Sequence, residues 1–293
     1  MSFLFWADLS GHQLHMSSRL HIYISCMATV LLFCFLPMTA KSRDNDNSVV
    51  NYSYAVLFGT GVYEVNDQQA FIFRVPFSHT VREPSYAHPG IKLVLPALAG
   101  IYDYDKISQG DVPDDAATLS FVPGLELEYV MSERWRLKPY GQAGFGRDLK
   151  NNENALIYVG GLNSHYKIPT SGKWRFALGN MLAYAGFDPD DSSSQSLGVL
   201  GVGIDMIYPW GLHLFGKNTN IANHLIYYSY LDNPGFDQGD DRSRSVRREI
   251  EWGLALDFKK PRRIIGIEFD RIGLGFRYGN NIKGIRLVTE FPF

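Results

Sequence analysis

Short stretches of this chain alternate between apolar and polar residues, and this alternation constrains the fold more than any other feature. In residues 249–258, isoleucine, tryptophan, leucine or phenylalanine occupies every second position, while glutamate, glycine, alanine or aspartate lies between them. The same period of two runs through residues 125–129, 134–138, 173–179 and 271–278. Because successive side chains of a strand point to opposite faces, these stretches predict β-strands with one apolar and one polar face.

The polar faces carry charged residues and glycine, which is typical of a crowded barrel lumen with apolar side chains turned outward. We therefore expect an all-β fold, a transmembrane antiparallel β-barrel of about 12 strands, an even number as in bacterial barrels. A soluble secreted β-protein is the alternative, because a β-sandwich also alternates. The predicted strands cover residues 51–61, 69–78, 90–103, 118–130, 134–147, 154–168, 173–186, 196–208, 212–231, 248–258, 263–279 and 283–293.

The predicted connections alternate between short turns and long polar links, as expected if both ends of the barrel segment lie on the periplasmic side. The short turns are expected around residues 132–133, 169–172, 209–211 and 259–261. The long links are expected at residues 104–117, 187–195 and 232–247.

The final stretch, residues 284–293, is predicted to close the barrel. Read at period two, its odd-numbered residues form an apolar-rich face that ends in Phe291 and Phe293. Arg286 and Glu290 fall on the opposite face, which we expect to point into the lumen. The apolar face is expected to contact lipid.

Residues 1–40 have the pattern of a secretory signal peptide. A basic residue, Arg19, precedes an apolar run over residues 22–36 that is too short to span a bilayer, and a polar stretch follows Ala40. Met16 is a possible true start. Residues 41–50 then form a short periplasmic segment, and residues 51–293 form the barrel.

Composition excludes several other classes of protein. Both cysteines, Cys26 and Cys34, lie in the predicted signal peptide, so neither a disulfide framework nor a cysteine metal site is expected in the barrel. No stretch of 18 apolar residues predicts a membrane-spanning helix. The formal net charge of −2 gives no sign of a nucleic-acid partner.

Charged residues on the polar faces predict a charge ladder in the lumen. Two interpretations stay open: a charged constriction that selects solutes, or a ladder of paired charges that plugs a narrow barrel. The predicted ladder consists of Glu126, Glu128, Arg134, Arg136, Lys138, Glu249, Glu251, Arg277, Arg286 and Glu290.

A hydrolytic site would need a nucleophile beside a histidine. Ser164 and His165 should lie on opposite faces of one strand, as should His224 and Ser229, and no G-x-S-x-G motif occurs. No catalytic residue, metal or cofactor is therefore expected. The aspartates of residues 188–191 and 237–241 lack the spacing of an EF-hand and are interpreted as exposed loops. Glycines in residues 198–203 are expected to make room for a side chain in the lumen or for a bend of the barrel.

The signal peptide, the twelve alternating strands and the ending Thr289-Glu290-Phe291-Pro292-Phe293 together resemble the β-domain of autotransporters. Only residues 41–50 precede the first predicted strand, so the chain resembles the solitary form of that family, which has no passenger. The resemblance implies that Phe291 and Phe293 form the signal read by the outer-membrane assembly machinery of a Gram-negative bacterium.

These features predict an integral, porin-like outer-membrane protein without enzymatic activity, with a structural or narrow-pore role. Its expected partners are outer-membrane lipid, the assembly machinery, and lipopolysaccharide, whose phosphates arginines such as Arg242 and Arg244 could contact. Two alternatives remain: a lipid or ester hydrolase, and a surface-interaction protein that acts through residues 232–247.

Overall fold

A computed structural model of the chain describes residues 56–65, 68–102, 117–149, 152–190, 194–214, 217–231, 246–264 and 267–293. The predicted signal peptide and the segment 41–50 lie outside the described residues. So do most of two predicted long links, 104–117 and 232–247. No helix among the described residues has both the length and the apolar character needed to cross a membrane.

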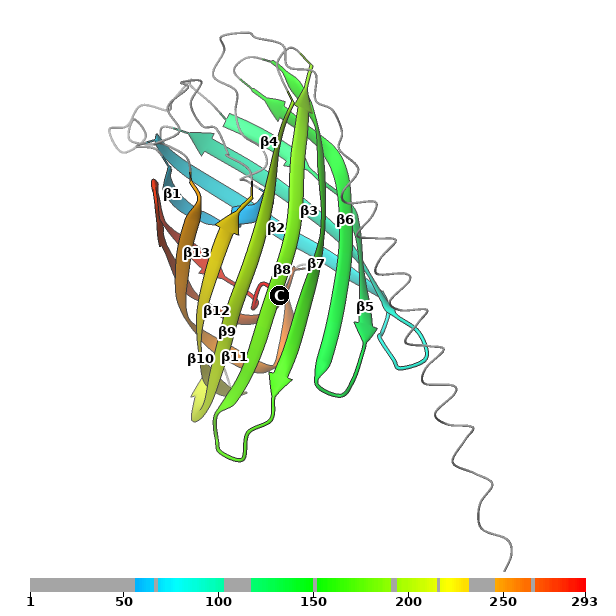
Figure 1. Cartoon of the computed structure of the whole chain (residues 1–293), viewed down its shortest axis with the longest axis vertical. Coiled ribbons are helices and arrows are strands. Elements are labelled where there is room, and N and C mark those ends of the chain that lie inside the picture. Colours follow the sequence, from blue (N-terminus) through cyan, green and yellow to red (C-terminus); the bar gives the residue numbers. More distant parts are fainter. Residues whose placement is uncertain are drawn as a thin grey trace, which may run out of the picture. The chain divides into compact units, whose positions relative to one another are not determined.

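The described strands form a closed antiparallel β-barrel, which confirms the predicted all-β fold (Figure 1). Neighbours in sequence pair along the sheet, and β13 pairs with β1 to close it. The strands are β1 (Gly61–Val65), β2 (Gln68–Arg82), β3 (Gly90–Tyr102), β4 (Ala117–Phe121), β5 (Gly124–Val130), β6 (Trp135–Asp148), β7 (Asn154–Ile168), β8 (Arg175–Pro189), β9 (Gln195–Leu214), β10 (Lys217–Tyr230), β11 (Arg248–Ile264), β12 (Ile267–Gly279) and β13 (Ile282–Val288).

The thirteen segments make twelve strands, because β4 and β5 are two halves of one strand. Both halves lie between β3 and β6 and pair with both of them. Val122 and Pro123 interrupt this strand, since proline has no N–H to donate to the ladder. The structure therefore confirms the position of the predicted strand 118–130, which is interrupted at Val122 and Pro123.

The two faces of the barrel wall have the polarity that the alternation predicts. On β11, Ile250, Trp252 and Leu254 point outward and are exposed, whereas Glu249 and Glu251 point inward and are buried. Leu274 and Arg277 of β12 show the same division. On these strands the outer face is thus apolar and the charged side chains lie on the inner face, whereas a soluble globular protein exposes its charged side chains.

Two of the predicted turns are wrong. Residues 209–211 lie within β9, which continues to Leu214, and residues 259–261 lie within β11, which continues to Ile264. Both predicted sites fall at register shifts, and Gly211 has a φ of 75°. Proline and glycine disturb a ladder at a bulge as well as at a turn, so the local sequence does not separate the two cases.

The predicted first strand, residues 51–61, is also wrong within the described residues, because β1 begins at Gly61; residues 51–55 lie outside them. Residues 56–58 form a helical turn instead, and the side chains of Val56 and Phe58 are buried in the apolar core. Tyr63 of β1 holds this segment in place, because its hydroxyl donates a hydrogen bond of 2.7 Å to the carbonyl oxygen of Phe58.

The closing strand is shorter than predicted. β13 ends at Val288, and the residues after it turn into the barrel, where the C-terminus is visible in Figure 1. Phe291 and Phe293 are buried and do not continue an outward face. The carbonyl of Thr289 still accepts bonds from the main-chain N–H groups of Asp270 and Arg271, but Pro292 has no N–H for a ladder.

The first and last strands pair along only a short stretch, which we call the seam of the barrel. β1 and β13 share only the register from Gly61↔Arg286 to Val65↔Ile282. On the side of the short turns, β2 meets β12 directly, with Phe77 opposite Ile267. The wall is therefore closed there without β1 or β13, and the segments flanking both strands lie inside it.

One half of the barrel is filled by an apolar core. We call the end of the barrel where β3, β8 and β10 finish the loop end, and the opposite end the turn end. Most core side chains come from the loop-end portions of the strands, and Val56, Phe58, Phe291 and Phe293 join the same core from the segments that flank β1 and β13. Those from the strands include Ile72, Leu98, Ile157, Phe187, Leu197, Ile226 and Ile282.

Closure at the seam generates a prediction. A Cβ added to Gly61 would lie 2.4 Å from the main-chain oxygen of Ile285, so Gly61→Val should prevent β1 from pairing with β13. We expect the variant to lose heat-modifiable migration on a gel. The matched control is Gly172→Val, because Gly172 lies in a turn with no atom within 4 Å of an added Cβ. Equal behaviour of both variants would contradict the described seam.

Candidate functional site

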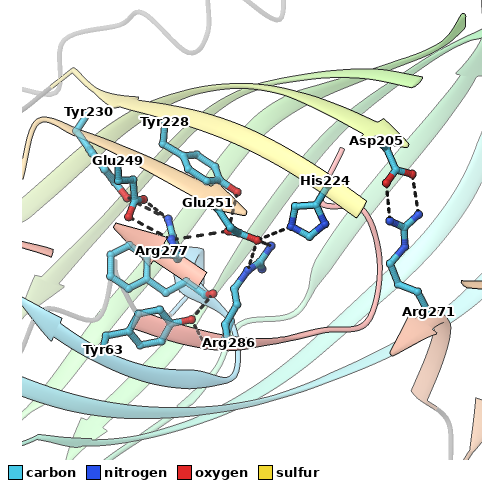
Figure 2. A network of polar contacts seen from close by, with 12 residues as sticks. Tyr63, Asp205, His224, Tyr228, Tyr230, Glu249, Glu251, Arg271, Arg277 and Arg286 are labelled. Carbon is cyan, nitrogen blue, oxygen red and sulfur yellow. Dashed lines mark hydrogen bonds and ion pairs between the residues drawn. The ribbon is translucent and has the colours of Figure 1, made fainter. Parts of the chain in front are cut away.

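A network of charged and aromatic side chains lies inside the barrel (Figure 2). Its members come from the four consecutive strands β10 to β13, and six of the seven are buried; Arg286 is 12% exposed. Two carboxylates face two guanidinium groups, so the formal charges balance. We call this group the lumen network, and it consists of His224, Tyr228, Tyr230, Glu249, Glu251, Arg277 and Arg286.

Glu251 is the centre of the lumen network. Its Oε1 accepts a bond from His224 Nε2 at 2.8 Å and one from Arg286 Nε at 2.9 Å. Its Oε2 lies 3.4 Å from the hydroxyl of Tyr228 and 3.8 Å from Arg277 Nε. Because the Glu251 side chain has no exposed surface, these donors replace the water that the carboxylate loses on folding.

Glu249 and Arg277 form the second ion pair of the network. Arg277 Nε lies 3.2 Å from Glu249 Oε2, and both Arg277 and Tyr230 donate to the other carboxylate oxygen. The Arg277 guanidinium also lies 4.5 Å from the ring centre of Phe58 and 4.8 Å from that of Tyr228. The charge is thus held between aromatic faces, which attract a cation strongly when water is excluded.

The segment before β1, residues 56–60, is hydrogen-bonded to the inner face of the wall in the same region. Arg74 Nη1 donates to the carbonyl oxygen of Val56 at 2.9 Å, and Thr60 exchanges hydrogen bonds with the main chain of Arg74. Tyr63 donates to the carbonyl oxygens of Phe58 and Gly59. This segment therefore caps the lumen network from inside the barrel.

A second ion cluster lies nearer the turn end. Arg271 of β12 binds both carboxylate oxygens of Asp205 on β9, at 2.8 and 2.9 Å. Asp257 lies 4.0 Å from Arg271 and accepts bonds from Asn220 at 2.7 Å and Arg175 at 3.2 Å. This cluster connects the five neighbouring strands β8 to β12 across the inner face of the wall.

The remaining predicted ladder residues lie apart from the lumen network. Glu128 and Arg136 form a half-buried pair at 3.5 Å, and Lys138 donates to the main-chain oxygen of Phe293 at 3.2 Å. Arg134 is exposed in the turn before β6, and Glu290 is exposed after β13. Glu126 is half-buried on β5.

The two aromatic residues of the C-terminal segment, residues 289–293, also lie within the barrel. Phe291 and Phe293 contact each other edge to face, with ring centres 4.9 Å apart. His165 and His224 pack on Phe291 with ring centres at 6.0 and 6.1 Å. These were the two histidines considered for a hydrolytic site, and in this structure they hold an aromatic ring.

The serines considered with those histidines do not join them. Ser164 accepts a bond from Trp135 Nε1 at 3.0 Å on the opposite face of β7 from His165. Ser229 falls between the buried Tyr228 and Tyr230 and so lies on the outward face of β10. Within the described residues, no group of three or more His, Cys, Asp or Glu side chains is placed to hold a metal ion.

Several residues of the site were not predicted. Asp257 and Arg271 lie on polar faces that the alternation identifies, so periodicity could have found them. Asp205 is a single acid among glycines and apolar residues of β9, and its partner is distant in sequence. The tyrosines of the lumen network are also absent from the ladder, because tyrosine suits either face of a barrel wall.

Comparison with known proteins adds no family. No family model matches the sequence, and no curated protein matches it significantly. The resemblance to autotransporter β-domains therefore rests on the architecture.

The lumen network generates a prediction about stability. Glu251→Ala should lower the free energy of unfolding by about 3–5 kcal/mol, because it leaves two buried guanidinium groups without their carboxylate. Glu64→Ala breaks the exposed 2.8 Å pair with Lys283 and should cost about 1 kcal/mol or less. Urea unfolding of the two variants in detergent micelles provides the measurement. Equal losses would mean that the network adds little to the barrel.

Proposed function

We propose that this chain is an integral outer-membrane β-barrel protein with a structural role and no enzymatic activity. The observation that carries the proposal is the reversed polarity of the wall, with apolar side chains outside and paired charges inside. Such an outer surface is costly in water and stable in lipid. A closed barrel also leaves no strand edge with unpaired main-chain groups, which a bilayer requires.

The distribution of outward aromatic side chains supports the membrane proposal. Barrels in membranes carry an apolar band with aromatic side chains at its two borders. Near the turn end, the exposed aromatic residues include Trp135, Tyr166, Trp174 and Trp210. Near the loop end, they include Phe145, Tyr184, Tyr227 and Tyr278. Aliphatic residues between these borders include Leu200, Val202, Leu225, Leu254 and Leu274.

The filled lumen favours a structural role over an open pore. Apolar side chains occupy the loop-end half of the barrel, and the lumen network lies against them. Of the two interpretations of the charges, paired residues that plug a narrow barrel fit this arrangement better than a selective constriction. The proposed membrane is the outer membrane of a Gram-negative bacterium, reached through the signal peptide and the assembly machinery.

The hydrolase alternative loses support from the contacts of His165 and His224 with Phe291. Most of the loop for surface interaction, residues 232–247, lies outside the described residues, so that alternative stays a prediction.

The membrane proposal predicts an effect that depends on depth. Leu274→Arg places a charge near the middle of the apolar band and should destabilise insertion by about 2–4 kcal/mol. Tyr278→Arg lies on the same strand and the same face, near the loop-end border, and should cost about 1 kcal/mol or less. Folding into lipid vesicles, followed by heat-modifiable migration, measures both. Release of the folded wild-type protein into buffer without detergent would overturn the proposal.

The structural role predicts that the wild-type protein carries no stepwise current in a planar lipid bilayer. The apolar core should keep water and ions out of the loop-end half. An open porin reconstituted in parallel serves as the positive control. Reproducible conductance steps from the folded protein would show that the narrow-pore alternative is correct.

A further inference from the structure

The C-terminal segment occupies a site whose shape matches its last ring. Three glycines of β8 and β9 face the ring of Phe293. A Cβ added to Gly179 would lie 2.1 Å from its Cδ2, one added to Gly203 would lie 2.9 Å from its Cε2, and one added to Gly201 would lie 3.3 Å from its Cε1. Any larger residue at position 179 or 203 would therefore overlap the ring of Phe293. We call these three glycines the cradle.

The rest of the segment is held by several different kinds of contact. Phe291 lies against His165 and His224, and the Arg271 guanidinium lies 5.8 Å from its ring centre. Lys138 donates to the main-chain oxygen of Phe293. The site thus provides places for two aromatic rings and a donor for the peptide oxygen.

One buried polar atom beside this site has no partner of its own. His224 Nε2 bonds to Glu251, while its Nδ1 has no hydrogen-bond partner among the described residues. The His224 side chain is 1% exposed, so water does not satisfy that nitrogen from outside. A buried group without a partner needs an explanation, and the His224 ring lies beside Phe291, where a bound peptide could supply the missing bond.

The segment can leave the site without breaking the barrel wall. The paired register of β13 ends at Val288, so residues 290–293 contribute nothing to the ladder. The main-chain N–H of Phe293 bonds within the segment, to the oxygen of Phe291. Glu290 is exposed and Pro292 is half-buried. Lys138 and Glu126, on the nearby turn-end part of the wall, are also half-buried. The site therefore borders solvent.

We propose that the cradle, with its flanking histidines and Lys138, is a binding site for an aromatic peptide, and that residues 290–293 are its intramolecular occupant. The ligand class is a short peptide with two phenylalanines separated by one residue. The chain's own segment blocks this site through its high effective concentration. If the attached segment has an effective concentration of about 1 mM and the site has a Kd of about 10 µM, the segment weakens binding of a free peptide by about 100-fold.

The test uses the full-length protein in detergent micelles and a fluorescent peptide of sequence Thr-Glu-Phe-Pro-Phe. Phe293→Ala empties the cradle and should bind the peptide with one-to-one saturation, about 100-fold more tightly than the wild type. Phe145→Ala removes the same ring from the outward surface, where it is 71% exposed, and should bind like the wild type. Gly179→Leu added to Phe293→Ala fills the cradle and should abolish binding.

Three outcomes would overturn the proposal. The wild type and Phe293→Ala could bind the peptide equally, or neither could bind it although both migrate as folded barrels. Toluene could also compete as well as the peptide, which would reduce the site to a packing cavity. The peptide Thr-Glu-Ala-Pro-Ala is the negative control for the rings. The proposed membrane function is tested separately, by detergent extraction and by folding into lipid vesicles, and none of the peptide-binding results bears on it.

A second measurement applies if Phe293→Ala does not fold. Pro292→Cys keeps both rings and introduces a thiol into a barrel segment that has no other cysteine. The peptide should displace the C-terminal segment and accelerate maleimide labelling of this thiol, whereas the alanine peptide should not. Labelling that is unchanged at saturating peptide would also contradict the proposal.

Discussion

The closure of this barrel depends on one buried carboxylate. Glu251 contacts His224 of β10, Arg277 of β12 and Arg286 of β13, so one side chain connects four consecutive strands. The last of these pairs with β1, which has only five residues in the ladder. A ladder this short contributes few hydrogen bonds, and an ion network across the inner face adds attraction where the wall is thinnest. The charges are therefore part of how the sheet closes.

The interior of the barrel changes character along its axis. The loop-end half holds an apolar core like that of a soluble domain, and the turn-end half holds charged side chains of which several are half-buried. The lumen network lies where the two regions meet, with Arg277 between Phe58 and Tyr228. Barrels of this size lie between the filled eight-strand and the open sixteen-strand cases. The loop-end half of this chain resembles the filled case.

Periodicity in the sequence predicted the barrel wall well, because the relevant information is local. The alternation of residues 249–258 assigned Glu249 and Glu251 to the inside and Ile250, Trp252 and Leu254 to the outside, as the structure confirms. The same reasoning identified four members of the lumen network. It did not identify their partners, since the contacts of Arg271 with Asp205 join residues that no local pattern connects.

The C-terminal segment shows why the local pattern was insufficient. Phe291 and Phe293 are two residues apart, so the same spacing suits a lipid-facing strand and a segment that inserts both rings into one site. The pairing of β13 with β12 stops at Val288 and Gly273, although β2 meets β12 only further along, at Phe77 and Ile267. Pro292 has no N–H to donate to a longer ladder. The glycines at residues 179, 201 and 203 instead leave space inside the barrel for the ring of Phe293.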